Sequence, residues 1–169
     1  HAYLFEGPAH VGKATVAKWF AGTLLAIGRS PEEQERLPHM IEKLLHPDFL
    51  ILDKLWMEEQ MEDADELAKY SNVSQEHRKK ARAKTDTIGI DDVRAIQERL
   101  QETGTGKYRI CIICDVERMQ DEAVNALLKI LEEPPAGVVF ILTTATFYAL
   151  LPTLISRSRV LHFSRLPDS

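Results

Sequence analysis

Short apolar runs alternate along this chain with longer stretches in which apolar residues recur at spacings of three and four. The apolar runs, which are bounded by glycine, proline or acidic residues, cover residues 2–6, 49–53, 108–114, 138–144 and 159–163. They predict buried strands. The helical spacing covers residues 13–27, 30–45, 90–100 and 121–133. Strands that alternate with helices predict an α/β fold, a three-layer sandwich in which helices cover both faces of a five-stranded parallel sheet.

The predicted helices carry recognisable faces and ends. In the first helix, the apolar stripe consists of Val16, Trp19, Phe20, Thr23 and Leu24. Ser30 precedes two glutamates and predicts an N-cap. Asp91 and Asp92 suit the positive N-terminal end of the third helix. Pro134 and Pro135 end the fourth.

Residues 54–87 are strongly polar. An acidic block, EEQMEDADE, is followed by a basic one, HRKKARAK. Blocks of opposite charge are typical of the solvated faces of a helical pair. We therefore expect a polar helical insertion within one α/β domain that spans residues 1–169.

Composition limits the possible classes of protein. At 169 residues and 44% hydrophobic content, the chain suits one domain with a sizeable core. A net charge of −5 argues against a globally basic nucleic-acid binder. No apolar run approaches the ~18 residues of a membrane span, and the first residues lack the features of a signal peptide. We expect a cytoplasmic protein with no membrane contact.

The two cysteines, Cys111 and Cys114, form a C-x-x-C pattern. Such a pattern can mark a redox pair or half of a zinc site. Here it lies in an apolar run that predicts a buried strand, where positions three apart point to opposite faces. The pattern therefore favours two core thiols.

The stretch GPAHVGKAT, residues 7–15, lies between the first predicted strand and the first predicted helix. The pattern G-x-x-x-x-G-K-[ST] in this context binds phosphates, because the backbone N–H groups surround the anion while the lysine reaches the outer phosphates. Gly7, Gly12 and Lys13 match the pattern. Ala14, however, stands where the Mg²⁺-binding hydroxyl is expected, and Thr15 comes one residue late, about 100° further round the helix. The predicted nucleotide-binding residues are Gly7, Pro8, Ala9, His10, Val11, Gly12, Lys13, Ala14 and Thr15.

Phosphoryl transfer also needs an acidic pair at the end of a later strand, one carboxylate to hold the metal and one to orient water. The third predicted strand ends in CDVE, residues 114–117. If Cys114 takes the metal-holding place, Asp115 is the only acid that follows before Val116. If Asp115 takes it, Val116 stands where the second acid belongs, and Glu117 would lie on the wrong side of an extended chain. Either way the pair is incomplete, which predicts passive nucleotide binding or none, and no metal site.

Several segments resemble the AAA+ domain of the bacterial DNA polymerase III clamp-loader subunits, the gamma/tau and delta-prime family, and most of all its delta-prime branch. These segments are HAYLFEGPAHVGKATVAKWFAG, HPDF, IGIDDVRAI, NALLKILEEPP and VVFILTTATFYALLPTLISRSR. Their order and spacing agree with the family across nearly the whole chain, and residues 54–87 are the main unmatched part. LEEPP and LLPT-x-x-SR are the most distinctive pieces.

The resemblance implies roles for three residues. The family's S-R-C motif reads Ser156-Arg157-Ser158 here, so Arg157 would be an arginine finger that reaches the nucleotide of a neighbouring subunit. Thr144 would be the polar sensor near the γ-phosphate, although a threonine that ends a strand also suits a simple backbone cap. Asp115 would be the remaining acid of the metal-binding motif. The implied cofactor is ATP or ADP.

The resemblance also has departures. Subunits of this type commonly carry a four-cysteine zinc module between the first helix and the second strand, and residues 16–48 contain no cysteine. We therefore expect no zinc. The helical lid and the collar domain of the family are not found after the fifth predicted strand, so we expect this chain to be a trimmed piece of a longer protein.

Three hypotheses follow. The first is a clamp-loader subunit that hydrolyses ATP poorly or not at all and supplies Arg157 to a neighbouring ATPase. Its partners would be the gamma/tau and delta subunits, and within the assembly the sliding clamp and primer-template DNA. The second is an active ATPase of the gamma/tau type that uses Thr15 and Asp115 in shifted roles. The third is a P-loop nucleoside or nucleotide kinase, for which no sequence element supplies an acceptor pocket with a general base.

Overall fold

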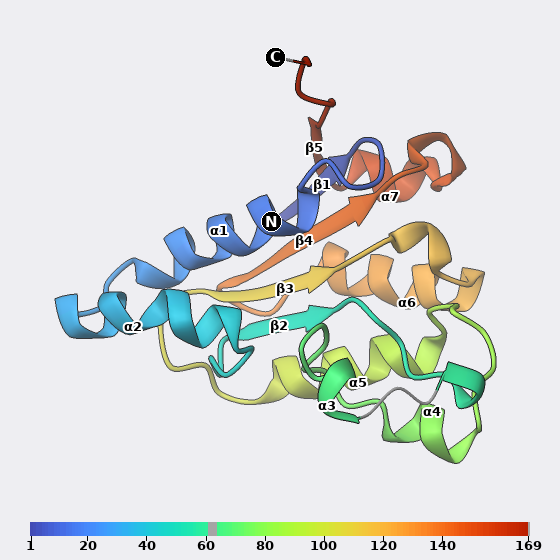
Figure 1. The fold of residues 1–169 in the computed structure, drawn as a ribbon, viewed down its shortest axis with the longest axis horizontal. Helices are drawn as coiled ribbons and strands as arrows, with labels where there is room; N and C mark the ends of the chain where they lie inside the picture. Colours follow the sequence, from blue (N-terminus) through green and yellow to red (C-terminus); the bar gives the residue numbers. More distant parts are fainter. Residues whose placement is uncertain (61–63, 169) are drawn as a thin grey trace.

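The computed structural model describes residues 1–60 and 64–168 and has a five-stranded parallel sheet at its centre (Figure 1). The strands are β1 (Ala2–Glu6), β2 (Phe49–Leu52), β3 (Arg109–Ile113), β4 (Val138–Thr144) and β5 (Arg159–His162). Their order across the sheet is β2-β3-β4-β1-β5, and every neighbouring pair is parallel. The predicted strands and the parallel sheet are confirmed. Because the strands are parallel, all their carboxyl ends meet at one edge of the sheet.

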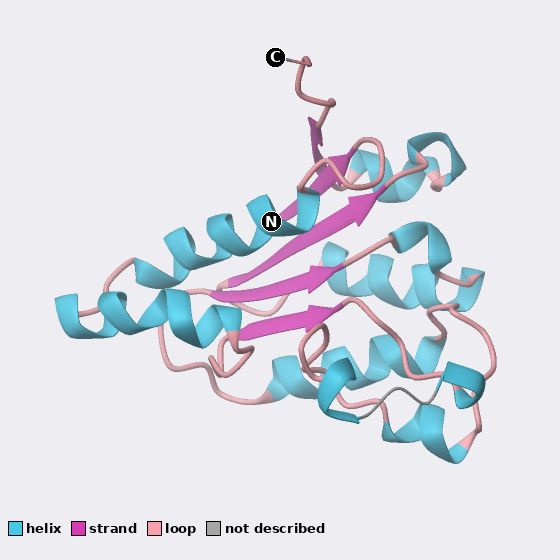
Figure 2. Ribbon diagram, viewed as in Figure 1, coloured by secondary structure: helices cyan, strands magenta, loops and turns pink. Residues whose placement is uncertain are grey.

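Helices cover both faces of the sheet (Figure 2). On one face lie α1 (Lys13–Ala26) and α2 (Pro31–Glu42); on the other lie α5 (Ile90–Gln101), α6 (Asp121–Glu132) and α7 (Pro152–Ser156). Ser30 caps α2 as predicted, accepting from the amide of Glu33 while the Glu33 carboxylate accepts from the Ser30 amide. Each face buries its own apolar cluster, so the α/β sandwich is confirmed. Among the described residues, no helix has the length and apolar character that crossing a membrane requires.

Cys111, in β3, and Cys114, which directly follows it, lie on opposite faces of the sheet, as predicted. Cys111 packs in the cluster under α5 and α6, and Cys114 in the cluster under α1 and α2. Both are buried free thiols. Burial raises the pKa of Cys111 to about 12 and raises that of Cys114 as well, so both stay protonated at neutral pH. Their place in the core favours a packing role.

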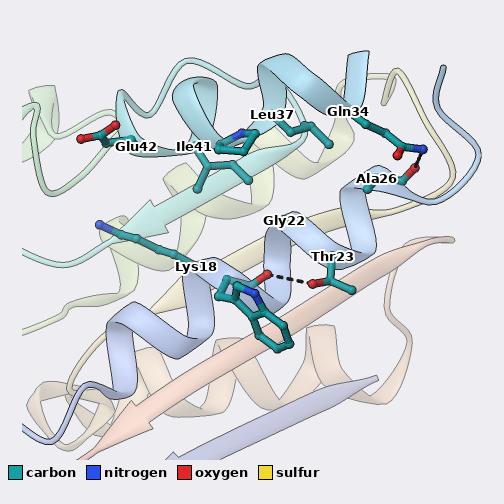
Figure 3. Close-up of a pocket in the computed structure, with 10 residues that line it drawn as sticks. Lys18, Gly22, Thr23, Ala26, Gln34, Leu37, Ile41 and Glu42 are labelled. Carbon is teal, nitrogen blue, oxygen red and sulfur yellow. Dashed lines mark hydrogen bonds between the residues drawn. The ribbon is translucent and has the colours of Figure 1, made fainter. Parts of the chain in front are cut away.

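The apolar stripe of α1 is not the face that the helix buries. The residues that α1 buries are Lys13, Ala17, Ala21 and Leu25. Trp19 is 71% exposed, and Val16 is also exposed. Alanine lets the helix axis approach the sheet closely, so a narrow small-residue stripe faces the core and the bulky residues flank it. Trp19 instead borders a groove of about 460 Å³ between α1 and α2, together with Leu37 and Ile41 (Figure 3).

This difference can be tested by comparing two truncations in α1. Leu25→Ala should lower the free energy of unfolding by about 2–5 kcal/mol, because Leu25 is 2% exposed and its removal leaves a cavity. Trp19→Ala should lower it by less than about 1 kcal/mol, since most of the indole is already in water. Urea denaturation measures both. A larger loss for Trp19→Ala than for Leu25→Ala would contradict the observed burial.

Residues 54–87 differ from the expected pair of solvated helices. The region contains a 3₁₀ turn at Glu58–Gln60 and two short helices, α3 (Ala64–Leu67) and α4 (Glu76–Lys80). Residues 61–63 of the acidic block lie outside the described residues. Val73 and Arg78 are buried, so part of the basic block faces inward. The Arg78 guanidinium donates to three loop carbonyls, those of Trp56, Thr85 and Thr87, and pairs with Asp92 at 3.1 Å. An arginine in this place satisfies carbonyl groups that a non-helical loop leaves unpaired.

Candidate functional site

Residues 7–15 join the carboxyl end of β1 to the first turn of α1, as the motif requires. Gly7 has a φ of 153°, and a Cβ at this position would lie 2.3 Å from the Phe163 carbonyl oxygen. Gly12 is the N-cap of α1 and has a φ of 91°. Side chains are disfavoured in this region of backbone space. Both glycines of the motif are therefore needed for the shape of this loop.

The loop presents a run of unpaired backbone donors. Among the residues that the structure describes, the amides of residues 9–15 donate to no other protein group. The first amide of α1 to bond backwards is that of Val16, which donates to the Gly12 carbonyl at 2.9 Å. Free N–H groups at a helix N-terminus attract anions, because they are donors and lie at the positive end of the helix dipole. The backbone of the loop therefore fits a phosphate group.

Lys13 is turned back onto the loop. Its side chain is buried, and Nζ donates to the carbonyl oxygens of Gly7 at 2.7 Å and Pro8 at 2.6 Å. An ammonium group has three donors, so one remains for another acceptor. Ala14 follows without a hydroxyl, and Thr15 is exposed. The loop thus fits phosphate but offers no side-chain ligand for Mg²⁺ at the expected place.

Asp115 lies close to the phosphate-binding loop. It follows β3 directly, with a φ of 55°, and its amide donates to Thr143 Oγ1 at 3.0 Å. Burial raises the pKa of Asp115, while the positive charges of Arg118 and Lys13 act to lower it. Asp115 follows β3 and the loop follows β1, so both lie at the carboxyl edge of the parallel sheet, with only β4 between the two strands. The structure therefore brings these two predicted elements together.

Glu117 does not lie where an extended chain would put it. After Asp115 the backbone turns into a short 3₁₀ helix, Val116–Arg118. Glu117 Oε1 accepts from the amide of Ala145, just beyond β4, at 3.2 Å. Glu117 Oε2 is buried, and no described group donates to it. The left-handed backbone at Asp115 thus brings a second carboxylate to the edge of the sheet, which the sequence reasoning placed on the wrong side.

Sequence reasoning also missed Asp53 and Arg118. Asp53 follows β2, and burial raises its pKa, with the charge of Asp115 adding to the rise and that of Arg118 opposing it. Arg118 donates to the carbonyls of Asp53 at 2.8 Å and Cys114 at 2.6 Å, and pairs with Asp86 at 2.8 Å. These side chains line a polar pocket of about 250 Å³. The sequence pattern could have identified Asp53 as a candidate site residue, since this acid directly follows an apolar run that predicts a strand.

Thr144 is fully buried at the end of β4, and its Oγ1 accepts from the amide of Thr146 at 3.1 Å. Its hydroxyl thus caps the turn that follows the strand. Side chains alternate along a strand, so the preceding Thr143 faces the α1 side, where it contacts the amide of Asp115. Thr143 is therefore the threonine in contact with the acidic turn.

Arg157 lies at the other end of the sheet. It is the C-cap of α7, and it lines a hollow together with His1, Ala2 and Phe140, where β1 and β4 begin. The phosphate-binding loop follows the opposite end of β1. That strand has five residues, so the two ends are about 16 Å apart. The structure does not bring Arg157 together with the loop of its own chain.

The comparisons with known proteins agree on one family. The sequence profile described as "DNA polymerase III, delta subunit" matches residues 1–167. The DNA polymerase III subunit delta' of Bacillus subtilis (strain 168) is 31% identical over 171 residues, covering 98% of this chain and 43% of that protein. The subunit tau of the same organism is 29% identical over 167 residues, covering 98% of this chain and 25% of that protein.

A solved structure supports the same assignment. The DNA polymerase III gamma subunit-related protein of Thermotoga maritima superposes with a TM-score of 0.60 at 25% identity, covering 99% of this chain and 42% of that one. The chain therefore spans less than half the length of each of these relatives. Delta' and tau are matched at nearly equal identity, so similarity alone does not separate the two branches. With the P-loop AAA+ fold and a profile match over nearly its whole length, the chain belongs to the DNA polymerase III delta subunit family of clamp-loader proteins.

Proposed function

We propose that this chain is the AAA+ domain of a delta-prime-type clamp-loader subunit, which binds ATP or ADP passively and presents Arg157 to the nucleotide of a neighbouring ATPase subunit. The assembly would load the sliding clamp on primer-template DNA in the cytoplasm. The other clamp-loader subunits, of the gamma/tau and delta types, are the proposed partners.

The position of Arg157 carries this proposal. The guanidinium lies on the surface at the edge of the sheet where strands begin, while the phosphate-binding loop lies at the edge where they end. From this position Arg157 cannot reach a nucleotide bound at the loop of its own chain, because the loop lies at the opposite edge of the sheet. A neighbour that docks against the edge where strands begin could receive Arg157, and a guanidinium supplied in trans stabilises the charge that develops on a transferred phosphoryl group.

The passive role is supported by the loop itself. The free amides of residues 9–15 fit phosphate oxygens, whereas Ala14 offers no ligand to a metal. Lys13 is held by two carbonyl oxygens and must release or share them to reach a phosphate. Bound MgATP would supply the phosphates and the metal charge, and this chain would contribute backbone donors and one ammonium group. We expect no zinc.

Nucleotide titrations with and without Mg²⁺ test the passive role. In the full-length protein we expect the dissociation constant for ATP to change by less than about threefold when EDTA replaces Mg²⁺, because no side chain at the expected place positions the metal. Isothermal titration calorimetry measures this. A Gly12→Val variant serves as the control for binding by the loop and should lose affinity. An increase of tenfold or more with Mg²⁺ would contradict the proposal.

An active ATPase of the gamma/tau type is the second candidate, and Glu117 is the observation that favours it. Its buried Oε2, which lacks a partner among the described residues, could accept a proton or a hydrogen bond from an attacking water. Turnover of MgATP by the isolated full-length protein decides between the two candidates. Steady hydrolysis that Glu117→Gln and Lys13→Ala both abolish would establish the active enzyme and overturn the passive role.

A further inference from the structure

The guanidinium of Arg157 is held by a carboxylate from another helix. Arg157 Nη2 lies 2.6 Å from Glu132 Oε1. Glu132 is the last residue of α6, and Arg157 is the C-cap of α7. The contact therefore joins the ends of two helices that pack together, through residues that lie 25 positions apart in the sequence.

Both ends of this contact are anchored through their backbones. On one side, α6 stops at Glu132 shortly before Pro134, which cannot continue a helix. On the other, the serines that flank Arg157 bond to carbonyls of α7: Ser156 Oγ donates to Thr153 at 3.0 Å and Ser158 Oγ to Leu154 at 2.8 Å. The main chain on each side is thus fixed. The Arg157 side chain, 37% exposed, is restrained mainly by Glu132.

The contact leaves most of the guanidinium available. It uses one nitrogen, Nη2, and no other described group accepts from Nε or Nη1. A guanidinium has five N–H donors in a planar fork. A phosphate group can therefore be bound by the remaining donors while Glu132 keeps its hold. Glu132 is itself half-exposed, so a docking partner can reach the pair.

We propose that Glu132 is a positioning residue for the finger: its carboxylate keeps the Arg157 guanidinium in one orientation, ready for a phosphate group of the neighbouring subunit's nucleotide. This inference rests on the proposed function of Arg157. Its physical basis is the entropy of a long side chain, because an arginine that is already ordered loses less freedom when it engages the phosphate. In this proposal Glu132 acts through Arg157 and does not itself bind the nucleotide.

The expected effect is modest and specific. Exposed ion pairs couple weakly, and the upper end of their range corresponds to about a fivefold change in rate. Glu132→Gln should therefore lower the kcat of the neighbouring ATPase site by about two- to fivefold. The KM for ATP should stay unchanged, because the neighbour's own loop binds the nucleotide. Glu132→Asp keeps the charge and should recover part of the loss.

The test uses the clamp-loader assembly reconstituted from full-length subunits, with MgATP turnover as the readout. Glu133→Gln is the matched control: it removes the same charge from the next residue, whose carboxylate has no partner among the described residues. It should leave kcat unchanged. In an Arg157→Ala background, Glu132→Gln should have no further effect, since the interaction it modifies is already gone. Gel filtration and thermal unfolding check that each variant folds and joins the assembly.

The outcomes separate this inference from the function on which it rests. If Arg157→Ala itself leaves turnover unchanged, the finger assignment fails. If Arg157→Ala depresses turnover and Glu132→Gln does not, Glu132 has no positioning role. Equal losses for Glu132→Gln and Glu133→Gln, or an undiminished loss in the Arg157→Ala background, would also overturn the inference, because they indicate a general effect of surface charge.

Discussion

An Arg157→Ala variant is expected to enter the clamp-loader assembly normally and to lower kcat at the neighbouring ATPase site by about 10³-fold, the lower end of what an arginine finger contributes. The expected defect is in turnover rather than folding, because the Arg157 side chain is 37% exposed and its ion pair with Glu132 is a surface contact. The measurement is single-turnover hydrolysis in an assembly whose other ATPase sites are silenced through their own P-loop lysines.

Two further variants sharpen this test. Arg157→Lys keeps the positive charge but lacks the planar fork, so it should restore only a small part of the rate. Arg159→Ala removes a second exposed arginine from the same hollow and should have a much smaller effect, which makes it the matched control. Full activity of Arg157→Ala, or equal losses for Arg157→Ala and Arg159→Ala, would contradict the proposed role.

Arg78→Met is expected to lower the free energy of unfolding by about 3–5 kcal/mol, the typical result of removing one partner from a buried ion pair. The side chains of Arg78 and Asp92 are 6% and 2% exposed. Without the guanidinium, the Asp92 carboxylate keeps His77 and the Gly89 amide as partners, but the carbonyls that Arg78 serves lose their donor. Chemical denaturation followed by circular dichroism measures the loss.

Lys79→Met is the matched control for Arg78→Met. It removes a positive charge from the adjacent position of α4, where the side chain is exposed and pairs with Glu76 on the same helix. The expected change in the free energy of unfolding is within about 0.5 kcal/mol. Similar losses for the two variants would indicate that net charge, rather than the buried contacts of Arg78, stabilises residues 54–87.

The fold was predictable because β2, β3 and β4 are buried along their whole length and β1 along most of it, whereas only the edge strand β5 is largely exposed among the described strands. Strands that are buried on both faces are continuous apolar runs, and such runs separated by helical periodicity determine the α/β class. The side of a helix that faces the core was harder to predict. The stripe in α1 that includes Trp19 satisfies the periodicity equally well, but the small residues Ala17 and Ala21 allow the closest approach to the sheet.

The site was predictable where backbone shape determines it. Gly7 and Gly12 predict the shape of the loop between β1 and α1, because few other residues tolerate its dihedral angles. Glu117 was misplaced because the sequence gives no sign that Asp115 adopts a left-handed conformation, and that one residue redirects the following side chains. The prediction that the basic block is solvated failed at Arg78 for a related reason. A run of basic residues does not indicate which of them is buried and donates hydrogen bonds to loop carbonyls.

Gly7, at the start of the loop between β1 and α1, packs closely against Phe163, the residue that directly follows β5. The Phe163 amide donates to the Glu6 carbonyl at 2.7 Å, and its ring packs against that of Phe5 at a tilt of 37°. There is no room for even a methyl group between the two segments, so a shift of the Gly7 backbone toward Phe163 would have to displace Phe163 as well. We therefore expect a change of conformation at the start of the loop to reach the segment that follows β5.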